Sequence, residues 1–575
     1  MITFAFAKAV VKLITLHKYK SINKMNKIKS VLLFSILLIS TTVKAQTIND
    51  GKSLFYYEKY ISAKDVFSKL VAANSNDIDA AYWLGQSEIQ LEDTASAQAL
   101  YQKTLAANSN SPLLIAGLGH IALLQGNTAD ARNRFETAIS LSKGKNVDVL
   151  NAIGFANVDV KAGDAAYAID KLKLATALKD GAKNPDVFCN LGDAYRKIGD
   201  GGSAQTAYQA ALAVQHNYAR ASYRTGKIYQ TQGYSQQDIF MKYYNDAIVE
   251  DPNYSPVYYN LYDYYYTTDV TKSGTYLEKY LTLKGADEPN ACYYRASMKY
   301  AQGLFKDAIT QSDICIGATA TPYPSLYGLK AYAYFRLGDS LDAKSSFESY
   351  FAKQESNKIG ATDYVTYTRV LLKLGTADTA LATTSLNKGL ALDSLESDKV
   401  THLRSIATDF ETSKDFKQAG DYYNKILAVK ANPTKTDLYN AGYSYFRSGA
   451  YNQAVSAFTV YTQKFPDDAF GFYMVGKSYW GIDSTMQKGL ANASFQKAIE
   501  VGSADSVKYK QQLIGSYGYF IPYYVNVKRD KQAALDYCDK ILALDPTNAN
   551  ALSNKEVISK LNLKPEPAKK AAKKE

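Results

Sequence analysis

The stretch from Thr436 to Asp468 has the apolar spacing of two consecutive amphipathic helices. On the first, apolar and small residues recur at i, i+3, i+4 and i+7: Leu438, Ala441, Gly442 and Tyr445. A Ser-Gly turn follows at Ser448 and Gly449, and Pro466 ends the second helix. That helix presents the same kind of face: Ala454, Phe458 and Tyr461. The stretch therefore predicts a helix–turn–helix unit of 34 residues whose small residues let the helices approach closely.

The same unit recurs along most of the chain. Its small eighth residue, or the residue in that position, returns every 34 to 39 residues: Gly85, Gly119, Gly154, Gly192, Gly226, Tyr262, Ala296, Ala331, Thr368, Ala407, Gly442 and Gly476. A second small residue follows twelve positions later in the regular units, and an aromatic residue four beyond it, as in Ala97/Tyr101 and Ala454/Phe458. A period kept over this length predicts an all-α array of helix pairs.

These positions resemble the tetratricopeptide repeat (TPR), whose pattern is W-x2-L-G-x2-Y, then A-x3-F, then P. In the unit at 436–468, Leu438 stands in place of the Trp and Ala441 in place of the Leu. The resemblance implies a TPR-type α-solenoid, a right-handed superhelix of about 12–14 repeats, in which each repeat contacts its neighbours. We expect it to span residues 46–563, with an irregular segment at 503–530 where the spacing slips.

The first 45 residues have the features of an export signal. Residues 25–45 begin with a positive region that contains Lys27 and Lys29. An apolar run from Val31 to Ile39 follows, and a small-residue cleavage site ends at Ala45. The apolar run is shorter than the roughly 20 residues of a spanning helix, so we expect a cleaved Sec signal peptide and no transmembrane anchor in the mature chain. Residues 1–24 are interpreted as a mis-assigned start. The expected location is the periplasm or cell envelope.

The formal charge of +12 comes mainly from the two ends of the chain. Residues 1–45 hold eight Lys and no acid, and residues 564–575 hold five Lys and two Glu, which leaves about +1 for the repeats. Nothing in the repeats therefore favours nucleic acid as a partner. Residues 564–575 have no apolar material to bury and are expected to form a disordered basic tail.

The four cysteines, at 189, 292, 315 and 538, form neither a disulfide framework nor a metal site by spacing. Cys292 and Cys315 fall on facing helices of one unit. Their state is left open between a disulfide and two reduced thiols, with reduced thiols favoured.

No spacing of His, Cys, Ser or carboxylate residues matches a known catalytic, phosphate-binding or metal-binding motif. We therefore expect no enzyme activity, no cofactor and no metal.

The resemblance also implies a binding surface, because in TPR proteins positions 2, 5, 9, 12 and 13 of the first helix line the concave face. Here positions 5, 9 and 12 carry aromatic residues in several units, and arginines and lysines share that face. The candidate partner-binding residues are Tyr223, Tyr259, Tyr266, Tyr293, Tyr300, Tyr332, Phe335, Tyr439, Tyr443, Phe446, Arg447, Tyr473 and Trp480. Flat rings with Arg are typical of contact surfaces. The alternative is that these rings pack between neighbouring units.

Two classes of function remain in contention. The first is a protein–protein interaction scaffold whose concave groove binds a peptide or protein, as TPR proteins commonly do. The second is a glycan- or envelope-polymer-binding protein, because Tyr and Trp faces also stack on sugar rings. The fold alone decides neither.

Overall fold

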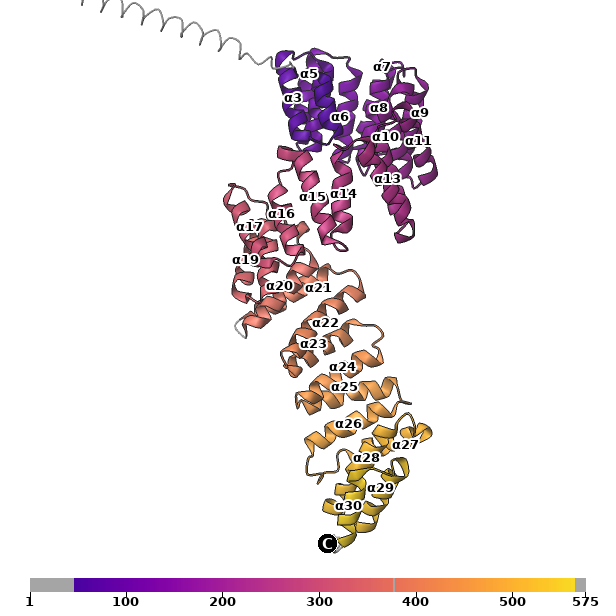
Figure 1. Ribbon diagram of the computed structural model, residues 1–575, viewed down its shortest axis with the longest axis vertical. Coiled ribbons are helices and arrows are strands. Elements are labelled where there is room, and N and C mark those ends of the chain that lie inside the picture. Colours follow the sequence, from indigo (N-terminus) through magenta and orange to yellow (C-terminus); the bar gives the residue numbers. More distant parts are fainter. Residues whose placement is uncertain (1–45, 376–377, 564–575) are drawn as a thin grey trace, which may run out of the picture. The chain divides into compact units, whose positions relative to one another are not determined.

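The computed structural model describes residues 46–375 and 378–563, which form two compact units, one ending at Tyr294 and one beginning at Arg295. In this described part of the chain there are 29 α-helices and no strand (Figure 1). The predicted all-α repeat fold is confirmed. The interpretations of residues 1–24, 25–45 and 564–575 concern segments outside the described residues.

The first unit is built from seven consecutive helix pairs. Its helices are α2 (Ile48–Tyr56), α3 (Tyr60–Ala73), α4 (Ile78–Gln90), α5 (Thr94–Ala107), α6 (Pro112–Leu124), α7 (Thr128–Leu141), α8 (Val147–Asp159), α9 (Ala165–Ala177), α10 (Pro185–Lys197), α11 (Gly201–Val214), α12 (Ala219–Gln230), α13 (Gln237–Glu250), α14 (Ser255–Tyr265) and α15 (Val270–Lys284), with short 3₁₀ turns η1 (Gly181–Lys183), η2 (Tyr234–Gln236) and η3 (Gly285–Asp287).

The boundary between the two units lies in α16 (Ala291–Ala301). The second unit continues with α17 (Phe305–Gly317), α18 (Ser325–Leu337), α19 (Ser340–Lys353), η4 (Ser356–Lys358), α20 (Ala361–Leu374), α21 (Thr379–Leu392), α22 (Glu396–Thr412), α23 (Phe416–Val429), α24 (Lys435–Arg447), α25 (Tyr451–Lys464), α26 (Ala469–Ile482), α27 (Asn492–Gly502), η6 (Ser503–Asp505), α28 (Lys510–Pro522), η7 (Tyr523–Lys528), α29 (Lys531–Leu544) and α30 (Ala549–Lys560). Helices α22 to α26 stack in chain order in Figure 1.

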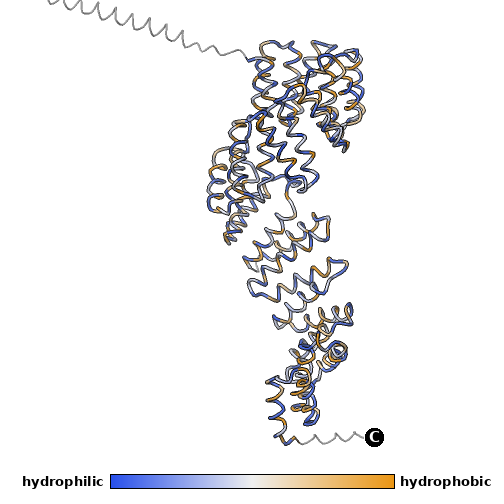
Figure 2. The backbone as a smooth tube through the Cα atoms, turned by 45° about the vertical axis from the view of Figure 1, so that its right-hand side comes forward, coloured by the Kyte–Doolittle hydropathy of each residue, from blue (hydrophilic) through white to orange (hydrophobic). Residues whose placement is uncertain are grey.

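Hydrophobic and hydrophilic residues are interspersed along the helices (Figure 2). The small eighth residue of a repeat faces a large side chain on the second helix. A Cβ added at Gly85 would lie 2.3 Å from the Tyr101 ring, and one added at Gly442 would lie 2.7 Å from the Phe458 ring. Tyr101 and Phe458 are both fully buried. The predicted pairing of a small residue with a ring sixteen positions later is confirmed in these repeats.

Adding one methyl group at Gly442 should therefore destabilise the second unit. The new Cβ overlaps the Phe458 ring, and overpacking costs about 1–3 kcal/mol, against a helix-propensity gain of up to about 1 kcal/mol for Gly→Ala. The matched control is Gly518→Ala, also inside a helix, where nothing lies within 4 Å of the added atom. Urea unfolding should show a loss for Gly442→Ala and no loss for Gly518→Ala; equal effects would mean that the helix crossing is not tight.

Turns between the paired helices use Gly followed by Asn or Asp. Gly126, Gly199 and Gly338 have φ of 76°, 83° and 81°, in the left-handed region that favours glycine. The next residue then caps the second helix, as where the Asp200 side chain accepts from the Ser203 N–H at 2.9 Å. Gly163, which precedes Asp164 in a turn of the same kind, does not have a positive φ; glycine fits there because a Cβ would lie 2.3 Å from the Asn157 carbonyl oxygen.

The first unit closes on itself through its N-terminal helix pair. The Ser62 N–H and hydroxyl donate to the two Asp287 carboxylate oxygens at 2.8 and 2.6 Å, and the Tyr57 hydroxyl donates to Asp251 at 2.9 Å. The Lys284 ammonium donates to the Glu58 carbonyl oxygen. The Tyr56 ring lies 5.3 Å from the ring of Tyr254. These partners lie about 200 residues apart in sequence, so the unit is a closed turn of repeats rather than an open array.

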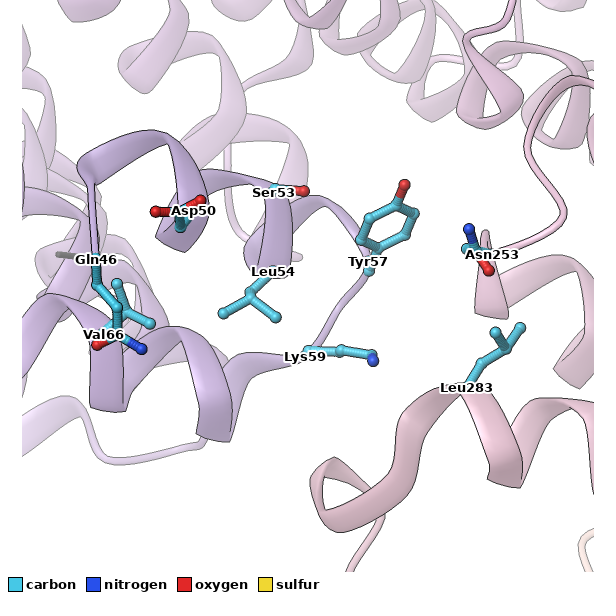
Figure 3. A pocket seen from close by; sticks show the side chains of 9 residues that line it. All are labelled: Gln46, Asp50, Ser53, Leu54, Tyr57, Lys59, Val66, Asn253 and Leu283. Carbon is cyan, nitrogen blue, oxygen red and sulfur yellow. The ribbon is translucent and has the colours of Figure 1, made fainter. Parts of the chain in front are cut away.

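A hollow of about 550 Å³ lies along this seam (Figure 3). Its lining includes Leu54, Tyr57 and Lys59 from the N-terminal pair, and Asn253 and Leu283 from the end of the unit. In Figure 3, Tyr57 and Lys59 lie on one side of the gap and Asn253 and Leu283 on the other. Its lining mixes aliphatic side chains with scattered polar ones, so the hollow is a feature of the closure.

Residues 503–530, predicted to be irregular, hold a 3₁₀ turn, the helix α28 and a π-helical turn η7. Pro522 lies at the end of α28, where it removes a backbone donor and marks the change of helix type. Cys292 and Cys315 are both disulfide-bonded, so the favoured interpretation of two reduced thiols is wrong; Cys189 and Cys538 are free and buried. None of the helices in 46–375 and 378–563 combines the length and apolarity needed to cross a membrane.

Candidate functional site

The first helices of the repeats form the inner face of each unit. In the first unit α4 contacts α6, α6 contacts α8 and α8 contacts α10; in the second, α18 contacts α20, α20 contacts α22 and α26 contacts α28. Helices that reach their counterparts two positions along lie on the shorter, inner side of a curved stack. A ligand bound on the inner side of the stack would therefore contact these first helices.

In the second unit, predicted residues of α24 and α26 form one exposed surface. We call Tyr439, Tyr443, Phe446, Tyr473 and Trp480 the aromatic strip. The rings of Tyr439 and Tyr443 stack at 5.1 Å with an interplanar angle of 15°, and Tyr443 and Phe446 stack at 6.4 Å. Tyr439 and Tyr443 are each 36% exposed, so part of each ring can be reached by a partner.

Two cations lie along the aromatic strip. The Lys477 ammonium is 5.0 Å from the centre of the Phe446 ring and 5.7 Å from that of Tyr473. The Arg447 guanidinium lies 6.0 Å from the Tyr443 ring and 3.7 Å from the Phe416 ring. The strip therefore combines flat apolar faces with positive charge, a composition suited to an extended chain that carries apolar and acidic groups.

The local sequence fixes α24 firmly beneath the strip. Thr434 and Asp437 form a capping box at its first turn, and the Asp437 carboxylate also accepts from Lys430 at 2.7 Å and from Arg404 at 3.0 Å. Burial alone would raise the pKa of Asp437, but the hydrogen bonds from Lys430, Thr434 and Arg404 outweigh it and hold that pKa well below its usual range. A charged Asp437 thus anchors the start of the helix at neutral pH.

A second feature adjoins the strip. Between α26, α28 and α30 is a hollow of about 450 Å³ whose lining includes Tyr473, Trp480, Asn550, Ser553 and Asn554. The Trp480 ring packs edge-on against Tyr519 at 5.4 Å. The hollow thus has aromatic walls on one side and amide and hydroxyl groups on the other.

Predicted residues elsewhere in the second unit do not join the strip. The Tyr332 hydroxyl donates to Asp363 at 2.6 Å and its ring packs on Phe347, so it serves the contact between repeats. Phe335 lies beneath the Arg369 guanidinium at 4.8 Å, and Tyr300 packs on Phe305 at 5.3 Å. These three contacts are of the packing kind that the sequence left as the alternative.

The predicted tyrosines of the first unit cluster near its end. Tyr223 packs against Tyr244 and Tyr254, and burial raises the pKa of Tyr223 to about 12. Tyr259 is 38% exposed, whereas the Tyr266 ring lies 5.7 Å from Tyr262. The ring of Tyr293 lies 5.8 Å from that of Tyr294.

The sequence prediction missed an enclosed cavity of about 330 Å³ inside the first unit. It is lined by the first helices α4, α8, α10 and α12 and is bounded by the N-terminal pair. Applied to the earlier repeats, the same position rule would have found part of the lining: Asp79, Tyr82, Gln86 and Gln90 in one repeat, and Asp148, Asn151, Phe155 and Asp159 in another. The sequence prediction listed candidate binding residues from Tyr223 onward, nearly all of them aromatic, and so left these polar positions out. The closure of the unit had no signal in the sequence.

Tetratricopeptide repeat families match residues 50–112, 189–255 and 438–468. These three stretches contain tetratricopeptide repeats. The matched stretches contain α2 to α5, part of α10 with α11 to α13, and the pair under the aromatic strip. TPR proteins are generally non-enzymatic scaffolds that bind proteins. A comparison with curated proteins gives no match.

Several solved TPR structures are similar to parts of the chain. The C-terminal part of a TPR repeat-containing protein from Cytophaga hutchinsonii is 25% identical over 46% of this chain and 98% of its own, with a TM-score of 0.29. A TPR protein from Parabacteroides merdae is 19% identical over 45% of this chain and 98% of its own, with a TM-score of 0.35. YrrB, described as a TPR protein with an unusual peptide-binding site, is 18% identical over 34% of this chain and 96% of its own, with a TM-score of 0.23.

Proposed function

We propose that the protein is a non-enzymatic scaffold of the bacterial cell envelope that binds an extended peptide or a protein partner on the aromatic strip. The observation that carries the proposal is the stack of Tyr439 on Tyr443, half-exposed and flanked by Arg447 and Lys477. Rings already held in a stack lose little side-chain entropy on binding, which makes them efficient contact residues. The envelope location rests on the predicted signal peptide at 25–45.

The strip favours a partner of stated chemistry. Two cations lie over rings on the strip. Acidic side chains of a bound peptide could therefore pair with these cations while its apolar side chains contact the rings. We therefore expect the bound segment to alternate apolar or aromatic residues with Asp or Glu, and binding to weaken as salt is raised.

Replacing Tyr439 and Tyr443 together with alanine should abolish most of this binding while the fold is kept. Truncating central aromatic contacts costs at least about 2 kcal/mol, which is about 30-fold in affinity. The full chain would be screened against a peptide array, and the tightest peptides measured by fluorescence anisotropy with wild type and the double variant.

The control for that experiment is Tyr234→Ala, a tyrosine of the first unit that is 68% exposed in the turn before α13. It should bind as wild type does. If peptides that bind the full chain bind the double variant equally well, the strip is not their site and the proposal is wrong.

A glycan ligand is the second candidate, favoured by the hollow beside Trp480. Its amide and hydroxyl groups, Asn550, Ser553 and Asn554, can hydrogen-bond sugar hydroxyls while Tyr473 and Trp480 supply stacking faces. Soluble glycans that bind with little salt dependence, and lose binding in Trp480→Ala, would support this candidate over the peptide.

A further inference from the structure

The cavity of the first unit exists because the unit is closed. Tyr56 and Glu58 from the N-terminal pair line it together with Arg220 and Tyr254 from the other end of the unit. The backbone N–H of Arg220 donates to the Tyr56 hydroxyl at 3.4 Å, and the rings of Tyr56 and Tyr254 are 5.3 Å apart. An open array of the same repeats would leave only a shallow face here. At about 330 Å³, the enclosed space is within the range of small-molecule sites.

The lining of this cavity is aromatic. Rings of Tyr82, Trp83 and Phe155 contribute to it from α4 and α8, and Tyr56, Tyr60 and Tyr254 close it. Trp83 packs edge-on against Phe55 at 5.1 Å and Tyr82 at 5.5 Å, so its position is fixed. Such rings present negative faces, which attract cations.

The same lining has a surplus of negative charge. Among the described residues, the carboxylates of Glu58, Asp79 and Asp148 have no ion pair with Lys, Arg or His within 4 Å. Asp159 accepts from the Gln90 amide at 3.1 Å and faces His120 at 3.2 Å. Glu58, Asp79 and Asp148 are therefore available to a positively charged ligand, whereas Asp159 already has two partners.

Two of the three cationic side chains of the lining, Arg220 and Arg224, already lie beside acidic groups, although the Arg224 Nε has no hydrogen-bond partner among the described residues. Arg220 contacts Asp186 at 3.2 Å, Asn190 at 2.6 Å and Asp193 at 2.8 Å, and Arg224 lies 3.4 Å from Asp193. The remaining one, Lys52, holds its ammonium 5.4 Å from the centre of the Trp83 ring. An ammonium therefore already lies over this ring, supplied by the chain itself.

We propose that the closed first unit binds a small organic cation, an ammonium compound whose charged group lies over the Trp83 ring and among the carboxylates of Glu58, Asp79 and Asp148. The ligand takes the position near Trp83 that the flexible Lys52 side chain holds in its absence. A neutral sugar would use the amides and rings but not the unpaired carboxylates. An anion would meet those carboxylates directly. This site is separate from the aromatic strip, so it is tested independently of the proposed function.

Trp83 makes the cavity directly observable. The chain has two tryptophans, Trp83 and Trp480, so Trp480→Phe leaves Trp83 as the sole indole reporter. The probe would be choline, titrated against the full-length Trp480→Phe chain. Its neutral carbon isostere, 3,3-dimethylbutan-1-ol, and glucose would be titrated in parallel. We expect a saturable change in Trp83 fluorescence with choline and none with the two neutral probes.

Variants of the lining sharpen the test. Asp79→Asn with Asp148→Asn should weaken choline binding by about tenfold, because two negative charges are lost from the lining. Lys52→Met should strengthen it, since the competing ammonium is removed. Asp79 and Asp148 are exposed side chains at helix starts, so the double variant keeps the fold, and Asp65→Asn, outside the cavity, serves as the matched control.

Each other outcome would overturn the assignment. An equal response to the neutral isostere would show an apolar site without charge recognition. A response to glucose alone would show a sugar site. No saturable response to choline, or equal binding by the Asp79→Asn, Asp148→Asn double variant, would show that the rings and carboxylates do not act on a cation.

Discussion

Replacing Asp193 with alanine should lower the free energy of unfolding of the first unit by about 3–5 kcal/mol. The Asp193 side chain is 3% exposed, accepts from the Tyr208 hydroxyl at 2.7 Å and pairs with Arg220 at 2.8 Å. Arg224 approaches the same carboxylate at 3.4 Å. Without it, two guanidinium groups remain in the interior of the unit with much of their charge uncompensated. Urea denaturation of the full chain, followed by circular dichroism, measures the loss.

An exposed ion pair provides the control. Asp65 pairs with Lys69 one helical turn away, and both side chains are more than half exposed. Asp65→Ala should change stability by no more than about 0.5 kcal/mol. If Asp193→Ala cost no more than that, the buried network would be a consequence of packing and not a source of stability.

The same residue gives the acid response a defined direction. Burial alone would raise the pKa of Asp193, but Arg224 and Arg220 outweigh it and lower that pKa. The stability contributed by a carboxyl with a lowered folded pKa is present above its unfolded pKa of about 3.9 and is lost as pH falls through the folded value. Wild type should lose this stability below about pH 4, and Asp193→Ala should lose less over the same range.

Removing the first helix pair, residues 46–73, should raise the rate of amide hydrogen exchange at the far end of the first unit by about 100-fold. In an open array a terminal pair protects its neighbour alone. Here it also binds Asp251, Lys284 and Asp287 through hydrogen bonds that each contribute about 1 kcal/mol. Amides near residues 251–263 and 280–288 should therefore exchange faster, as well as those of α4.

The matched control is removal of α30 at the other end of the chain. The main contact of α30 is with α29, and its side chains also join a cluster with α28, so faster exchange should stay within α28 and α29. If removing residues 46–73 affected α4 and α5 but left 251–288 unchanged, the closure would contribute nothing to stability.

Local packing rules explain what the sequence could predict. A small residue at Gly85 or Gly442 is required because a ring from the paired helix lies where its side chain would be. This requirement acts over sixteen residues, so it appears as a period in the chain. The turns follow in the same way, since Gly126, Gly199 and Gly338 must adopt positive φ. The buried tyrosines also follow the pattern, as Tyr101 is buried with its hydroxyl donating to the Tyr82 carbonyl at 2.8 Å.

The closure and its cavity could not be predicted in this way. They depend on small rotations summed over seven repeats, and no local pattern records that sum. Tyr56 and Tyr57 have the composition of ordinary packing residues, yet they contact Tyr254 and Asp251 at the far end of the unit. The prediction that Tyr332 belongs to the binding surface could not be corrected from the sequence for a related reason. The residue that accepts its hydroxyl hydrogen bond, Asp363, lies in the next repeat, and no sequence pattern marks it as the partner.

The closure also restricts how the first unit can change in evolution. Most solenoids gain and lose whole repeats by duplication or deletion, because each copy needs only its two neighbours. In this unit, one additional copy between α4 and α13 would rotate and displace Asp251 and Asp287 away from Tyr57 and Ser62. The number of copies in the first unit is therefore fixed by geometry, as the blade number is in a propeller.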